Sequence, residues 1–240
     1  MNETKINLPE IILIKPQLPQ NLGAVARAML NFNFCKLRVV NPKFNLNNEK
    51  IIPLAAGADV VIKKMKVFSS YRNAIKDFNL LISTSNRDRA IEKMTISISE
   101  LPQIIKNQAN VGIIFGPENS GLDNEHLSFS DYILKIPANP SFSSINLSHA
   151  VLLVCYEIIQ NVVLKKDLGT KNRIKNIASK KELLNFYKIL ELELEDKNFF
   201  LVNERKKIII QKIRNIFGKL VLNSSEIKIL IGIVKALNKQ

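Results

Sequence analysis

The feature that most constrains the fold is a series of short apolar runs separated by helical patterns. The runs are rich in β-branched residues, as expected for strands buried on both faces of a sheet: residues 10–14, 37–40, 80–84, 111–115 and 132–136. Patterns typical of helices lie at about 22–33, 54–63, 70–77, 100–107 and 146–164. Strands that alternate with helices predict an α/β fold, a parallel sheet flanked by helices.

A change in composition marks the rest of the chain. Residues 165–178 are polar and basic, and three helical patterns follow without a strand, at about 180–195, 203–217 and 224–238. The sequence therefore predicts three parts: a domain over residues 1–164, a basic linker over 165–178, and a small all-helical domain over 179–240.

The net charge of +14 favours a polyanionic partner such as nucleic acid. A Lys-, Asn- and Ile-rich composition, of the kind an AT-rich genome produces, is a competing explanation. The distribution of charge along the chain helps to choose between these two explanations. Residues 1–160 hold 17 Lys and Arg against 13 Asp and Glu, whereas residues 161–240 hold 18 against 8. The excess is concentrated where a nucleic-acid-binding appendage would lie.

Several classes of protein are disfavoured by what the chain lacks. Cys35 and Cys155 have no CxxC partner, and His126 and His149 are the only histidines, so neither a disulfide framework nor a metal centre is indicated. The N-terminus has no signal pattern, and the apolar run at 150–164 is interrupted by a glutamate and two amides. These features predict a cytoplasmic protein with no membrane span.

A parallel sheet binds ligands at the carboxyl ends of its strands, so the loops after those ends are the candidate site. The first loop runs into "NLGAVARAM", where Asn21 is a plausible helix N-cap and Gly23 allows close approach to the backbone. Arg27 follows among alanines. Its charge is costly to bury alone, so it either pairs with an internal carboxylate or has a functional role.

The other three loops are also polar. "STSNRDR" (83–89) offers hydroxyls, an amide and arginines, and "FGPENSGL" (115–122) fits neither the dinucleotide fingerprint nor a P-loop. Glu118 in that loop is placed to pair with a buried arginine. In "IPANPSFSSINLSHA" (136–150), two serines and an asparagine exceed what one helix cap requires, which favours a ligand-binding wall.

Together, "NLGAVARAM", "FGPENSGL" and "IPANPSFSSINLSHAVLLVCYE" resemble the three ordered motifs of the SpoU/TrmH group of RNA ribose 2'-O-methyltransferases, over residues 10–160. "LRVVNP", "LAAGADVV" and the C-terminal helical patterns are similar to the bacterial tRNA methyltransferases that modify cytidine or uridine at anticodon-loop position 32. This chain differs from those enzymes beside Glu118, because Pro117 and Asn119 stand where they tend to carry arginines.

The resemblance implies a sheet whose C-terminal part forms a trefoil knot (the SPOUT fold), a homodimer, a tRNA substrate and S-adenosyl-L-methionine as cofactor. It places the cofactor against eight residues: Thr84, Ser85, Asn86, Gly116, Ile136, Ser143, Ser144 and Ile145. The residues it places nearest the chemistry are Asn21, Arg27, Glu118, Ser144 and Asn146.

Methyl transfer to a ribose hydroxyl is a direct displacement that needs no metal and no covalent intermediate. It needs alignment of the two reactants and stabilisation of charge on the hydroxyl oxygen. Our hypothesis is that Arg27 orients and stabilises that oxygen or a neighbouring phosphate, that Glu118 holds Arg27, and that Asn21 shapes the pocket. A guanidinium is a poor general base.

Two alternatives stay open. One is ribose methylation of ribosomal RNA or of another tRNA nucleotide, and the other is a non-catalytic RNA-binding module of the same fold. Basic stretches at 165–175 and 203–207 are the expected phosphate contacts.

Overall fold

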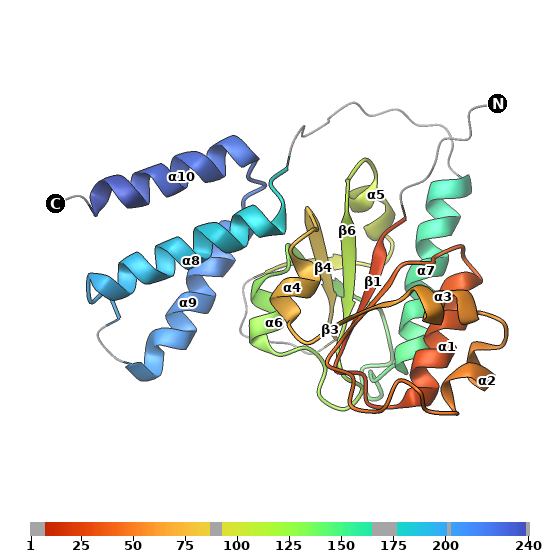
Figure 1. Ribbon diagram of the computed structural model, residues 1–240. Coiled ribbons are helices and arrows are strands. Elements are labelled where there is room, and N and C mark those ends of the chain that lie inside the picture. Colours follow the sequence, from red (N-terminus) through yellow and green to blue (C-terminus); the bar gives the residue numbers. More distant parts are fainter. Residues whose placement is uncertain (1–7, 87–92, 165–176, 201–202, 239–240) are drawn as a thin grey trace.

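A sheet of seven parallel strands forms the centre of the computed structural model, which describes residues 8–86, 93–164, 177–200 and 203–238 (Figure 1). The strands lie in the order β3-β2-β1-β6-β4-β7-β5. Their bounds are Glu10–Ile14 (β1), Leu37–Val40 (β2), Lys66–Phe68 (β3), Leu80–Thr84 (β4), Met94–Ser97 (β5), Val111–Phe115 (β6) and Tyr132–Lys135 (β7). The predicted α/β fold with a parallel sheet is confirmed.

Helices cover both faces of the sheet because alternate strand residues point to opposite sides. Ile11 and Leu13 of β1 belong to one buried cluster, and Ile12 and Ile14 belong to the other. The first face is covered by α1 (Pro19–Leu30), α2 (Ile51–Ala55), α3 (Asp59–Lys64), α5 (Leu101–Ile105) and α7 (Leu147–Leu164). The second is covered by α4 (Tyr71–Ile75) and α6 (Asn124–Ser128).

The three C-terminal helices are α8 (Lys180–Asp196), α9 (Asn203–Gly218) and α10 (Ser224–Leu237). Ser179 and Asn223 begin α8 and α10 with capping boxes, which fix where these helices start. The helices form an arm beside α4 and α6 (Figure 1). Phe186 and Tyr187 of α8 and Ile227 of α10 join the buried cluster on that face of the sheet. The arm is therefore attached through a shared apolar core.

Some details of the fold differ from the sequence expectation. The helix expected at 54–63 is two helices, because Ala56 and Gly57 adopt φ values of 44° and 92° between them. The strands β3 and β5 and the helix α6 were not expected, and all three are short. Most of the expected linker, residues 165–176, lies outside the described residues. The division into domains stays a prediction.

Candidate active site

The carboxyl ends of β4, β6 and β7 enclose a cavity of about 320 Å³. These three strands are neighbours in the sheet, so the loops that follow them meet although they are far apart in sequence. All eight residues expected to bind the cofactor line this cavity: Thr84, Ser85, Asn86, Gly116, Ile136, Ser143, Ser144 and Ile145. The structure thus brings together three of the four predicted loops in one concave site.

Asn86 holds two sides of the cavity together. Its Oδ1 accepts a hydrogen bond from Ile136 N at 3.3 Å, and its Nδ2 donates to Ser143 O at 3.1 Å. Thr84 Oγ1 donates to Ile114 O at 3.0 Å, which joins the end of β4 to β6. The loop after β7 is therefore fixed to the end of β4 by side-chain bonds. Residues 87–89 of the predicted second loop lie outside the described residues.

Gly116 and Gly121 give the loop after β6 its shape. A Cβ atom at Gly116 would lie 2.5 Å from Leu122 N, which no side chain tolerates. Gly121 has a φ of +65°, and its N–H donates to Pro117 O at 2.9 Å. Both glycines are thus required for the tight turn that carries Glu118 to the rim of the cavity.

Glu118, Asn21 and Asn146 form a hydrogen-bonded chain beside the cavity. Asn21 Nδ2 donates to Glu118 Oε1 at 2.8 Å, and Asn146 Nδ2 donates to Asn21 Oδ1 at 3.2 Å. Asn21 is only 7% exposed, so these bonds satisfy a buried amide. The chain links the three sequence motifs through one polar residue from each.

The asparagine expected to cap α1 has a different role. α1 begins at Pro19, so Asn21 lies within its first turn and its side chain is used for the network. Asn146 caps the later helix instead. Its Oδ1 accepts from Ser148 N at 2.9 Å, immediately before α7. The two serines expected to form a wall, Ser143 and Ser144, are exposed at the cavity and are not needed as caps.

Glu118 does not hold Arg27, and that part of the hypothesis is wrong. Arg27 is exposed in the last turn of α1 and makes no ion pair with any described residue. It lies six residues after Asn21, about 9 Å further along the helix axis, and it does not line the cavity. Arg27 is thus available to a molecule outside this chain.

Gln17 is a site residue that the sequence did not predict. Its N–H donates to Glu118 Oε2 at 2.9 Å, and its Oε1 accepts from Asn119 N at 3.3 Å. Each of the two loops therefore donates one backbone N–H to a side chain of the other. The only sequence signal was the position of Gln17 between two prolines, which stiffen the segment.

The close approach expected at Gly23 exists, but its partner is the protein itself. A Cβ atom at Gly23 would lie 2.1 Å from Ile51 O in α2. Gly23 is therefore required for helix packing and does not contact the cavity.

Among the described residues, no group of three or more His, Cys, Asp or Glu side chains is arranged to hold a metal ion. In the same residues, no helix has the length and apolar character needed to cross a membrane.

The fold and the three connected motifs define a class of protein. The chain belongs to the SpoU rRNA methylase family, whose sequence model matches residues 9–156. Among its relatives, the tRNA (cytidine-2'-O-)-methyltransferase TrmJ of Methanocaldococcus jannaschii is 33% identical over 212 residues, which cover 85% of this chain and 90% of that protein.

Similar proteins match the C-terminal helices as well. The tRNA (cytidine/uridine-2'-O-)-methyltransferase TrmJ of Photorhabdus laumondii is 32% identical, over 95% of this chain and 96% of that protein. The crystal structure of TrmJ from Z. mobilis superposes with a TM-score of 0.88 at 35% identity, and covers 97% of this chain and 100% of that one. The similarity therefore extends to the whole architecture.

Proposed function

We propose that this chain transfers the methyl group of S-adenosyl-L-methionine to the 2'-hydroxyl of a cytidine or uridine in tRNA, at anticodon-loop position 32. The observation that carries the proposal is the convergence of the three motifs on one cavity through the Glu118–Asn21–Asn146 chain. The similarity to TrmJ proteins over nearly the full chain supports tRNA as the substrate.

The lining of the cavity fits such a methyl donor. Leu134, Ile136 and Ile145 offer apolar surface for a heterocycle, and the serine and asparagine side chains offer hydrogen bonds for a ribose and an amino-acid group. The volume of about 320 Å³ lies in the range of small-molecule sites. When bound, the cofactor supplies an electrophilic methyl group on a sulfonium.

The chain's own residues then have distinct roles in this proposal. Ser143 and Ser144 bind and orient the donor at the cavity wall. Asn21 and Asn146 hold the neighbouring loops in position, and Glu118 fixes the start of α1 through Gln17 N and Asn21 Nδ2. Arg27 stabilises the developing charge on the ribose oxygen, or the phosphate beside it.

The active form in this proposal is a homodimer, in which Arg27 acts at the site of the partner. Arg27 lies outside the cavity of its own chain. Exposed apolar side chains lie at the start of α1 and on α7, the helix that packs against α1: Leu18 is 50% exposed, and Leu153 and Tyr156 of α7 are 39% and 46% exposed. Large exposed apolar side chains of this kind are typical of a protein–protein contact.

Mixing two inactive variants tests this arrangement. Arg27→Ala removes the cation, and Ser144→Phe fills the cavity, so each homodimer is expected to be inactive. If Arg27 acts across the dimer, co-refolded chains regain activity, because a mixed dimer keeps one complete site. About a quarter of the parental rate is expected, since half of the dimers are mixed and each has one site of two.

A chain that carries both substitutions, mixed with the parental chain, is the matched control. Its mixed dimers have no complete site across the interface, so they are expected to add no activity to that of the parental dimers. Activity in this control above that of its parental dimers, together with none in the first mixture, would place Arg27 at the site of its own chain.

Phosphate contacts of the RNA are proposed on the C-terminal arm. Arg205 and Lys207 are exposed on α9, whereas Lys206 is occupied by an ion pair with Glu195. The basic stretch at 165–175 lies outside the described residues. The proposal also includes the trefoil knot, a distinct helical domain over residues 179–240 with its basic linker, and a cytoplasmic location.

The runner-up is methylation of ribosomal RNA, because the matched family is described as rRNA methylases. Unmodified bulk tRNA and ribosomal RNA, each incubated with methyl-labelled S-adenosylmethionine, separate the two. We expect label in tRNA, on the ribose of nucleotide 32, and none with Ser144→Phe. Label in ribosomal RNA alone would favour the runner-up, and no label in either RNA would favour a non-catalytic RNA-binding module.

A further inference from the structure

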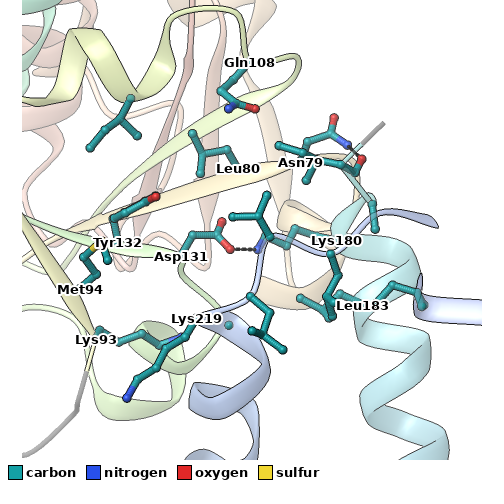
Figure 2. Close-up of a pocket in the computed structure, with 18 residues that line it drawn as sticks. Asn79, Leu80, Lys93, Met94, Gln108, Asp131, Tyr132, Lys180, Leu183 and Lys219 are labelled. Atoms are coloured by element: carbon teal, nitrogen blue, oxygen red, sulfur yellow. Dashed lines mark hydrogen bonds and ion pairs between the residues drawn. The ribbon is translucent and has the colours of Figure 1, made fainter. Parts of the chain in front are cut away.

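A second cavity lies at the end of the sheet opposite to the candidate active site. It is lined by Leu80, Met94 and Tyr132, which are the first residues of β4, β5 and β7. The active-site cavity, by contrast, lies where β4, β6 and β7 end. The C-terminal arm forms the other wall, with α8, the end of α9 and the start of α10 (Figure 2).

This junction cavity is larger than the active site and mostly apolar. Its volume is about 500 Å³, within the range of pockets that enclose small organic ligands. Ile104, Leu183 and Ile227 belong to its walls. Met94 is 64% exposed and Leu220 53% exposed, so the apolar lining continues to an open mouth.

The described part of the lining contains four charged residues. Lys180 Nζ pairs with Asp131 Oδ1 at 2.6 Å, and Figure 2 shows these two side chains pointing toward each other. The other two are Lys93 and Lys219. Because Lys93 is only 8% exposed, water screens its charge weakly.

Lys93 has hydrogen-bonding capacity left. Its Nζ donates to Ser130 O at 2.7 Å and to Ser128 O at 3.1 Å, which leaves one N–H without an acceptor among the described residues. Burial lowers the pKa of Lys93 to about 8, an effect that Asp131 opposes and that Lys180 and Lys219 reinforce. An anion in the cavity would favour the charged form of this lysine.

We propose that the junction cavity binds a small amphipathic anion, an apolar molecule with one acidic head group that pairs with Lys93. The apolar walls receive the body of the molecule, and the open mouth admits it. This site is independent of the proposed methyl transfer, since no residue of its lining belongs to the active-site cavity.

Calorimetric titration of the full chain with decanoate tests the proposal, with 1-decanol as the uncharged probe of the same length. We expect saturable binding of one decanoate per chain and binding of decanol at least about tenfold weaker, because a hydrogen bond to a charged group contributes about 1.5–3 kcal/mol. Lys93→Met is expected to weaken decanoate binding about tenfold.

The pH dependence identifies Lys93 specifically. Because its pKa is about 8 and a bound anion raises that pKa, affinity for decanoate should fall as the pH rises from 7 to 9. Lys93→Met should abolish this fall. Lys235→Gln removes an exposed lysine of α10 outside the cavity and should bind as the parental chain does.

Three results would overturn the proposal: no saturable binding of decanoate, equal affinity for decanol, or an affinity for decanoate that does not fall between pH 7 and 9. All three are measured on the parental chain, so they test the proposal even if Lys93→Met does not fold.

Discussion

Replacing Arg27 with lysine should lower the single-turnover rate of methyl transfer to tRNA about 100-fold, the usual effect of removing one donor from a developing oxyanion. Lysine keeps the charge but loses the planar fork that can bind a ribose oxygen and a phosphate together. Arg27→Ala should reduce the rate further. Affinity for S-adenosylmethionine should be unchanged in both variants, because Arg27 does not line the cavity.

Arg72→Lys is the matched control for this experiment. Arg72 is about half exposed on α4 and lies 4.0 Å from Glu125, away from the proposed site. Its replacement should leave the rate within about twofold of the parental value, because a surface ion pair contributes little. A parental rate in Arg27→Lys would exclude the proposed role of the guanidinium.

The central strands could be predicted from the sequence because they are buried on both faces. β1, β2, β4 and β6 begin and end where the apolar runs do, and their residues are almost all buried. Short runs that are mostly apolar and β-branched are typical of strands with both faces covered by helices. β7 ends one residue earlier than its run, at Lys135.

The edges of the sheet gave no such signal. β3 and β5 lie at the two ends of the strand order, and most of their residues are exposed or only partly buried. Polar residues are tolerated at these positions, so "KVF" and "MTIS" do not stand out from the loops around them. Edge strands are defined by their neighbours in space, which periodicity does not report.

The positions of the site residues were predictable, but the bonds between them were not. The motifs are contiguous, so the loops they occupy follow from the strand assignment. Which side chain bonds Glu118 depends on the packing of α1 against its neighbours. The position of Arg27 among alanines left a pairing with an internal carboxylate open, but Arg27 is exposed. The arginine that is buried in the sheet is Arg38 of β2, which pairs with Glu10 at 2.7 Å.

The junction cavity could not be predicted from any single stretch of sequence. Its lining comes from separate segments around residues 79–80, 93–94, 104–108, 131–132, 177–183 and 218–227. Each segment has an ordinary composition by itself. Only the attachment of the C-terminal arm to the sheet brings their lysines together.

Besides the shared apolar core, that attachment includes the buried ion pair of Lys180 and Asp131, and breaking it should destabilise the protein. Lys180→Met leaves the Asp131 carboxylate without its cation, although Asp131 Oδ2 still accepts from Leu81 N at 2.7 Å. The side chain of Asp131 is 18% exposed, so water compensates in part. We expect the free energy of unfolding to fall by about 3 kcal/mol, the low end for removing one partner of a buried pair.

The double variant Lys180→Met/Asp131→Asn separates the charge from the packing. An asparagine keeps an oxygen for Leu81 N and carries no charge, so stability should recover to within about 1 kcal/mol of the parental chain. Lys181→Met, at the exposed neighbouring position, is the control and should change stability by less than about 0.5 kcal/mol. Urea unfolding followed by circular dichroism measures all three. If Lys180→Met were as stable as Lys181→Met, the ion pair would contribute nothing to the attachment of the arm, which would then rest on the apolar core with Phe186 and Ile227 and on backbone hydrogen bonds.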